Sequence, residues 1–255
     1  MAEPQNYRMI VAYDGTGYSG FQSQPGRQTI QGALEKALGS ATGSADRVAG
    51  AGRTDAGVHA VGLVVSYRSA WRHSPDELQR ALNALLPGDV AVSGVERVAE
   101  SFHARYSATS REYVYRIYQS TVRLPHLDRF AWRVSSGIDE SRVKCASEMI
   151  VGEHDLRAFG TAAGGRSTVR RVMRAEWRRE PQLPWGAPIW QFSIEANGFL
   201  RGMVRRVVGT LVRVSEGHLE PDDVRDIIRA GDPARAGPPA PARGLFFWEA
   251  HYAGE

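Results

Sequence analysis

The stretch SPDELQRALNALLPGDVAVSGVERV, residues 74–98, places a helix with a well-marked start directly before a strand. Ser74 is a capping residue, Pro75 follows at the first helical position, and Glu77 stands three residues after the cap, which together form a capping box. The apolar residues of the helix recur at helical spacing, at Leu78, Ala81, Leu82 and Leu85. Residues 90–98, VAVSGVERV, are rich in valine, which predicts a strand after the helix.

The flanking sequence repeats one order of elements twice. Before this stretch we predict a strand, a helix and two strands, at residues 7–13, 30–38, 47–50 and 61–68. After it we predict a strand, a helix, two strands, a helix and a strand, at residues 111–119, 139–151, 168–179, 189–196, 200–211 and 245–252. A turn rich in proline and tryptophan joins the two middle strands, and a short helix follows Pro221.

Each half therefore has the βαββαβ order of a split ferredoxin-like unit. We predict an α+β protein with two such halves, residues 1–106 and 107–255. The halves should share a largely antiparallel central sheet, with helices on one face and a basic cleft on the other. The first half carries the loop around Asp55, and the second half completes the cleft.

The charged residues point toward an acidic partner without proving one. The chain of 255 residues has 32 Lys and Arg against 28 Asp and Glu, and only Lys36 and Lys144 are lysines, which leaves 30 arginines. Guanidinium groups suit phosphates and base edges, but a general preference for arginine explains the count equally well. A concentration of basic residues includes alternate positions on a strand, which could line one face with phosphate-binding charge: Arg166, Arg170, Arg171, Arg174, Arg178 and Arg179.

Several classes of protein are disfavoured by what the sequence lacks. Cys145 is the single cysteine, so an internal disulfide is excluded; we expect it in the core of a protein from a reducing compartment. The first residues lack the layout of a secretion signal, and no apolar run approaches the roughly 18 residues of a membrane span. We therefore predict a cytoplasmic protein.

Neither a metal nor a nucleotide cofactor is predicted. The nearest approach to a metal cluster is GEHD, residues 152–155, which helix-end capping explains as well. GTGYSG, residues 15–20, matches the dinucleotide pattern G-x-G-x-x-G. However, no helix opens at its third glycine, and no acid follows about 20 residues later. A glycine-rich turn near the cleft fits this segment better.

The stretch AGRTDAGVHA, residues 51–60, could hold a reactive carboxylate. Gly52 and Gly57 allow unusual backbone angles on both sides of Asp55, so a turn could project this side chain into the cleft. An aspartate that hydrogen-bonds its own turn is the alternative, and the residues alone leave both open. Arg201 or Arg205, one turn apart on a helix without acids, could supply the opposite charge.

Tyrosines on the strand at residues 111–119 also allow two interpretations. Tyr113 and Tyr115 project from the same side of this strand. Tyrosines in such positions usually pack across strands. A reaction on an extruded base, however, needs an aromatic ring to stack against that base.

Six segments together resemble the tRNA pseudouridine synthase A family, in the order that the family has them. They are YDGTGYSGFQ, AGRTDAGVHA, NALLPGD (Asn83 to Asp89), FHARYSATSREYVY, FLRGMVRRVVG and ARGLFF, and the resemblance extends from about residue 7 to residue 252. It implies an isomerase that converts uridine to pseudouridine at positions 38, 39 and 40 of the tRNA anticodon stem-loop. It also implies a homodimer that needs no cofactor.

The same resemblance implies a role for five residues. Asp55 occupies the aspartate of the pattern G-R-T-D-A-G-V-H and would be the nucleophile. Arg205 would be its salt-bridge partner, and Tyr113 matches the substrate-binding tyrosine. Arg53 resembles the residue that fills the space left by the flipped nucleotide. Leu245 matches a leucine whose side chain covers the uracil.

Two positions depart from the family pattern. Leu63 stands where the family usually has glutamine, and Gly202 stands where it has a side chain with functional groups. Neither position belongs to the implied chemistry, but RNA contacts at both places are in doubt.

Two other functions stay open on the residues alone. A tandem RNA-binding module can have the same strand order, although the aromatic pattern of RNA-recognition motifs is missing. A hydrolase of small glycosides would need a second carboxylate at a fixed distance from Asp55, and the motifs contain no obvious candidate.

Overall fold

The computed structural model describes residues 3–43, 47–180 and 187–254, and the chain divides into two compact units. The first unit contains residues 1–111 and 246–255, and the second contains residues 112–245. The chain enters the second unit within β5 (Ala108–Gln119) and returns to the first at the start of β10 (Leu245–Tyr252). The sequence-based division, 1–106 and 107–255, differs in assigning the last ten residues to the second half.

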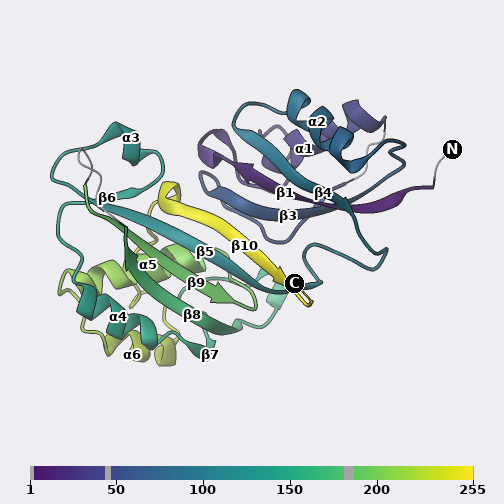
Figure 1. Ribbon diagram of the computed structural model, residues 1–255. Helices are drawn as coiled ribbons and strands as arrows, with labels where there is room; N and C mark the ends of the chain where they lie inside the picture. The colour runs from purple at the N-terminus through teal and green to yellow at the C-terminus, as the bar shows by residue number, and fades with distance from the viewer. Residues whose placement is uncertain (1–2, 44–46, 181–186, 255) are drawn as a thin grey trace. The chain divides into compact units, whose positions relative to one another are not determined.

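The first unit has the predicted βαββαβ order. Its elements are β1 (Gln5–Tyr13), α1 (Ile30–Thr42), β2 (Ala49–Gly50), β3 (His59–Ser69), α2 (Pro75–Leu85) and β4 (Val90–Arg97). Strand β1 lies between β3 and β4 and is antiparallel to both, and β2 pairs antiparallel with β3. The first residues of β3 also pair in parallel with β10, Phe246 opposite His59. Helices α1 and α2 lie together on one face of these strands (Figure 1).

The start of α2 follows the predicted capping box. The Ser74 Oγ atom accepts a hydrogen bond from the Glu77 backbone N–H (3.2 Å). The Ser74 backbone N–H donates in return to Glu77 Oε2 (2.9 Å). Further along the helix, Leu78 and Leu82 are fully buried, so the cap and the apolar face together define this element.

The second unit continues from β5 through eight further elements. They are α3 (Pro125–Asp128), β6 (Trp132–Val134), α4 (Glu140–Glu148), β7 (Gly152–Asp155), β8 (Val169–Arg179), β9 (Ile189–Ala196), α5 (Met203–Ser215) and α6 (Asp223–Ala230). The strand order is β5-β9-β8-β7, and β6 pairs in parallel with β5. Helices α4, α5 and α6 lie on one face of this sheet (Figure 1).

Along the chain the second βαββαβ order is present as β5, α4, β8, β9, α5 and β10, with α3, β6, β7 and α6 added, but β10 after Leu245 belongs to the first unit. The predicted α+β class and the largely antiparallel strand pairing are therefore confirmed. Residues 152–155 form β7, which pairs with β8, so helix-end capping was the wrong explanation for GEHD. Of the predicted turn between β8 and β9, residues 181–186 lie outside the described part of the chain.

The helices of the second unit pack through apolar faces. Five residues of the predicted stripe on α5 are buried: Met203, Val204, Val207, Val208 and Leu211. Trp177 of β8 donates from Nε1 to the Oγ atom of Ser147 on α4 (3.0 Å), and both side chains are buried. Cys145 is exposed, which corrects the expectation that it belongs to the core. It lies on the side of α4 opposite the buried Val143 and Ser147.

Within the residues that the structure describes, no helix combines the length and the apolar composition that a membrane crossing requires.

Candidate functional site

Asp55 lies on a loop between β2 and β3 that is anchored on both sides of the carboxylate. The Asp55 carbonyl accepts a hydrogen bond from the Val58 N–H (3.2 Å), which closes a turn. Gly57 in this turn has φ +76°, a conformation that favours glycine. Thr54 and Val58 are buried, and the Thr54 Oγ1 atom is 2.7 Å from the Tyr13 hydroxyl in a hydrogen bond. Asp55 itself is half-buried, less enclosed than Thr54 and Val58.

The glycine-rich segment at residues 15–20 packs directly on this loop. The Phe21 N–H donates to the Thr54 carbonyl (3.1 Å), and the Gly57 N–H donates to the Tyr18 carbonyl (3.3 Å). A Cβ atom at Gly15 would lie 1.9 Å from the Val58 carbonyl oxygen, far inside van der Waals contact. The close approach of two backbones, rather than a bound pyrophosphate, accounts for this glycine.

Gly20 meets the same loop from the other side. Its φ is +92°, and a Cβ atom there would lie 2.6 Å from the Thr54 carbonyl oxygen. Gly17, between these two glycines, would meet nothing within 4 Å. Within this motif, the close approach of the Asp55 loop therefore requires glycine at positions 15 and 20, whereas position 17 has room for a side chain.

The segment NALLPGD supports the glycine-rich segment in turn. Asp89 accepts a hydrogen bond from the Tyr18 hydroxyl at Oδ1 (2.6 Å), and its carbonyl accepts from the Asp14 N–H (3.0 Å). Burial and this nearby carboxylate raise the pKa of Tyr18 to about 12, so the hydroxyl stays a donor at physiological pH. The Asn83 side chain exchanges two hydrogen bonds with the backbone of Val92 (2.7 and 2.8 Å), which holds α2 to β4.

Arg111 joins the Asp55 loop to the start of β5. Its Nε donates to the carbonyl of Ala51, the first residue of AGRTDAGVHA (3.1 Å). Its Nη1 donates to the Ala108 carbonyl (3.1 Å), and its Nη2 donates to the Arg105 carbonyl. Arg111 is absent from the predicted site residues; its position in the motif FHARYSATSREYVY was the one signal for it.

Arg53 shares the loop with Asp55. Its side chain is exposed, whereas the residue between them, Thr54, is buried. The first unit thus brings two of the five predicted residues together, on one loop. The role of Arg53 remains a prediction.

The other three predicted residues belong to the second unit, and Tyr113 and Leu245 are both mostly buried there. The Tyr113 ring packs edge to face against Phe199, with centroids 4.8 Å apart. Tyr115 is fully buried, and its hydroxyl donates to the Pro241 carbonyl (2.7 Å). A Cβ atom at Gly244 would lie 2.7 Å from the Tyr115 ring, so this packing sets the position of the neighbouring Leu245. Tyr115 thus follows the packing interpretation.

Arg205 lies near the start of α5, beside the proline-rich loop before β10. Its Nε donates to the Ala240 carbonyl (2.7 Å), and the Ala240 N–H donates to the Arg205 carbonyl (2.8 Å). One turn later, a Cβ atom at Gly209 would lie 1.8 Å from the Pro238 carbonyl oxygen. The loop therefore sits directly on α5 and orients the half-buried Arg205 side chain.

The predicted basic face of β8 is partly neutralised. Arg174 forms ion pairs with Glu112 (2.9 Å), Glu176 (3.6 Å) and Glu195 (3.8 Å). Arg178 pairs with the same Glu176 (3.2 Å). Glu176 lies on β8 itself, whereas β9 contributes Glu195 and β5 contributes Glu112, which the arginine pattern of β8 alone did not reveal. Arg174 is thus a poor candidate for a phosphate contact.

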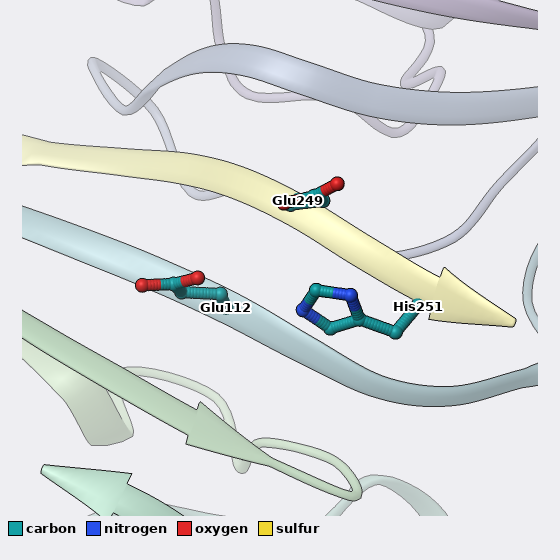
Figure 2. A group of neighbouring side chains, drawn as sticks. All are labelled: Glu112, Glu249 and His251. Carbon is teal, nitrogen blue, oxygen red and sulfur yellow. The ribbon is translucent and has the colours of Figure 1, made fainter. Parts of the chain in front are cut away.

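Glu112 on β5 and Glu249 and His251 on β10 have side chains of the types that bind metal ions. Figure 2 shows Glu112 on β5 and Glu249 and His251 on β10. Glu112 belongs to the second unit, where its carboxylate is already engaged by Arg174. Glu249 and His251 belong to the first unit and offer two ligand atoms within 4.8 Å of each other. Two ligands are fewer than the three or four protein ligands of a zinc site.

Comparisons with known proteins agree on one family. The sequence profile of the tRNA pseudouridine synthase family matches residues 9–107 and 146–253. The chain is 37% identical over 254 residues to a tRNA pseudouridine synthase A from Geobacillus kaustophilus, covering 98% of this chain and 96% of that protein. It is 40% identical over 245 residues to the protein of that name from Brevibacillus brevis, covering 96% and 98%.

The matched residues include the Asp55 loop, the glycine-rich segment that packs on it and most of α5 to β10. The profile match therefore includes four of the five predicted residues, namely Arg53, Asp55, Arg205 and Leu245. Tyr113 lies outside the profile match, in a region that the near full-length alignments with the two relatives cover. By profile and by near full-length identity, the chain belongs to the tRNA pseudouridine synthase family, a family of isomerases.

Proposed function

We propose that this protein converts uridine to pseudouridine at positions 38, 39 and 40 of the tRNA anticodon stem-loop, with Asp55 as the nucleophile. The observation that carries the proposal is the anchoring of the Asp55 loop. Buried Thr54 and Val58 and the contacts of Gly15 and Gly20 hold the backbone, while Asp55 itself is only half-buried. A reactive group needs this combination of fixed position and access.

The reaction requires little beyond a carboxylate and a uracil held in position beside it. The N1–C1′ bond of uridine breaks, the uracil rotates, a C5–C1′ bond forms, and the proton on C5 is released. Because no atoms other than exchanged protons are gained or lost, neither a redox nor an energy cofactor is required. An ionised Asp55 can act by attack on the sugar carbon or by removal of a sugar proton. The uridine must first leave the stack, at a cost of a few kcal/mol.

The roles of the other residues come from their place in the family's motifs. We propose Arg205 as the partner that keeps Asp55 ionised, and Tyr113 as the ring that holds the base. Leu245 would cover the uracil, and Arg53 would fill the space of the flipped nucleotide. Local packing supports the roles of Leu245 and Arg205. Gly244 packs closely on the Tyr115 ring and so positions the next residue, Leu245. The Ala240 carbonyl accepts a hydrogen bond from Arg205 Nε and so orients that side chain. Action as a homodimer in the cytoplasm is proposed from the resemblance alone.

The decisive experiment is tritium release from an anticodon stem-loop transcript labelled at uracil C5. We expect the wild type to release label and Asp55→Asn to be slower by a factor of at least about 10⁴, since removal of single catalytic side chains costs about 10⁴ to 10⁶ in kcat. Asp76→Asn is the matched control, because Asp76 is an exposed aspartate of the same unit, on α2. It should retain wild-type activity. Both variants are compared with the wild type at equal RNA occupancy.

Three results would contradict the proposal. Release by Asp55→Asn at the wild-type rate would show that another group initiates the reaction. Tight RNA binding without release by the wild type would favour a binding module, the first of the alternative functions. Turnover of a small glycoside without RNA would favour the second.

A further inference from the structure

The loop formed by residues 103–107, in the first unit, displays an aromatic side chain to solvent. Tyr106 is 72% exposed, more than any other large apolar or aromatic side chain among the described residues. The family's motif FHARYSATSREYVY contains it, yet none of the proposed roles uses it. An exposed tyrosine on a mobile loop would indicate no particular function. A role for Tyr106 in binding therefore depends on whether residues 103–107 are held in one conformation.

Hydrogen bonds within the loop hold it in one conformation. The His103 N–H donates to Ser107 Oγ (3.0 Å), and the Ser107 N–H donates to the His103 carbonyl (2.9 Å). The Arg105 N–H donates to His103 Nδ1 (3.1 Å). Since Nδ1 accepts, the proton of the neutral imidazole is on Nε2. The backbone on both sides of Tyr106 is thereby fixed.

Ala104 fastens the same loop to the body of the first unit. Its N–H donates to Ser66 Oγ on β3 (3.0 Å), and its carbonyl accepts from the Tyr252 hydroxyl on β10 (2.8 Å). Ala104 is fully buried, two residues from the exposed Tyr106. The tyrosine is thus presented on a rigid support, which lowers the entropy that a partner must remove on binding.

The groups around the Tyr106 ring are those that nucleic acids favour. The His103 ring lies 4.4 Å away between centroids, tilted by 38°. The guanidinium carbon of Arg105 lies 5.9 Å from the Tyr106 centroid. An exposed aromatic ring next to an arginine provides a face for a base and a charge for its phosphate.

Arg111 connects this loop to the proposed catalytic loop. The same guanidinium donates to the Arg105 carbonyl and to the Ala51 carbonyl. Ala51 begins the stretch that carries Asp55, so one side chain sets the spacing of both loops. The loop of residues 103–107 therefore borders the stretch that carries the proposed nucleophile.

We propose that Tyr106 stacks on an unpaired base of the RNA substrate close to the target uridine, with Arg105 beside the phosphate of that nucleotide. This rests on the proposed function only in requiring an RNA substrate. The ligand is a single-stranded nucleotide within a stem-loop, and the contact depends on a π face rather than on base identity.

The test is equilibrium binding of a fluorescent anticodon stem-loop transcript, with cytidine at positions 38 to 40 to prevent turnover, to the full-length protein. Stacking is worth about 1–3 kcal/mol per base, so Tyr106→Leu should weaken binding about five- to a hundred-fold. Tyr106→Phe keeps the ring and should bind within about twofold of the wild type. The loss should be equal at low and high salt, because stacking releases no counterions.

Trp71→Leu is the matched control. Trp71 is also an aromatic residue of the first unit with a histidine ring beside it, His73, at 5.0 Å, but it lies in the turn before α2. We expect its loss to leave RNA affinity unchanged. Sedimentation of each variant without RNA tests whether a second copy of the chain, rather than RNA, covers Tyr106.

Three outcomes would overturn the inference. Unchanged affinity of Tyr106→Leu, equal weakening by Tyr106→Phe, or a changed oligomeric state of Tyr106→Leu without RNA would each do so. If the wild type neither binds this transcript nor modifies the same stem-loop with uridine at positions 38 to 40, the proposed function fails as well. If it does both and Tyr106→Leu is unaffected, only the stacking role fails.

Discussion

Gly15 has room for a hydrogen atom and nothing larger. Because a Cβ atom would lie 1.9 Å from the Val58 carbonyl oxygen, Gly15→Ala must move the backbone of the Asp55 loop. We expect this variant to lose at least about tenfold in kcat, since small displacements of a catalytic group are costly. The measurement is tritium release under saturating transcript.

Gly17→Ala is the control from the same motif. Nothing lies within 4 Å of its added Cβ, and its φ is not among the positive values found at other glycines. It should therefore keep wild-type kcat. Equal activity of both variants would show that the contact of residue 15 with the Asp55 loop does not position the carboxylate.

These single residues also mark what the sequence can and cannot reveal. Asp55 could be singled out because glycines flank it and because its motif resembles a family signature. The purpose of Gly15 could not, since the clash that requires it involves Val58, more than 40 positions along the chain. For the same reason the ion pairs of Arg174 with Glu112 and Glu195 were invisible, as neighbouring strands bring these residues together.

Arg111, near the start of β5, holds the stretch that carries Asp55 through its hydrogen bond to the Ala51 carbonyl. Arg111→Gln shortens the side chain and leaves the Ala51 carbonyl without this donor. Hydrogen bonds from charged groups are worth about 1.5–3 kcal/mol, so we expect kcat to fall about tenfold to a hundredfold. The affinity for the stem-loop should change little, and Arg111→Lys should recover part of the rate. Separate measurements of kcat and of RNA affinity distinguish positioning from binding.

Arg68→Gln is the comparison for this variant. Arg68 pairs with Glu100 (2.9 Å), but both side chains are more than half exposed, and such pairs contribute little. Its kcat should match that of the wild type. A loss of RNA affinity in Arg111→Gln without any loss of kcat would assign Arg111 to substrate binding instead.

Helix α2 depends on its cap. Ser74→Ala removes the Oγ acceptor of the Glu77 N–H, which should lower the free energy of unfolding by about 1 kcal/mol in urea. Activity at equal folded protein should be unchanged, because the cap lies at the exposed start of the helix. An unchanged urea midpoint would mean that water replaces the cap without loss.

Elements with such local signals were predicted, and elements without them were missed. The capped α2 and the apolar stripe of α5 both contain enough turns to show their period. Strands β6 and β7 have three and four residues, too few for an alternation to be visible. Strand β7 is defined by its pairing with β8, a contact outside its own sequence. Cys145 was misplaced because it falls between buried positions of α4.

For the molecule as a whole, arginine-rich composition predicts salt-sensitive RNA binding. If about six arginines meet phosphates, affinity for the stem-loop should fall about a thousandfold between roughly 50 and 200 mM salt. Arg174→Gln should leave this slope unchanged, because its charge is balanced by three carboxylates. Binding isotherms at several salt concentrations give the slope. A flat response would argue against a phosphate-dominated interface.

Because residues 246–255 belong to the first unit, that unit cannot finish folding until β10 has been synthesised. At about 5–20 residues per second, a ribosome needs roughly 7–29 s to progress from residue 111 to the last residue. During this time the nascent first unit lacks Phe246 beside His59 and the Tyr252 hydroxyl on Ala104. The unit whose translation begins first is thus completed last. Its open strand edge near the Asp55 loop is the part of the newborn chain most in need of protection from aggregation.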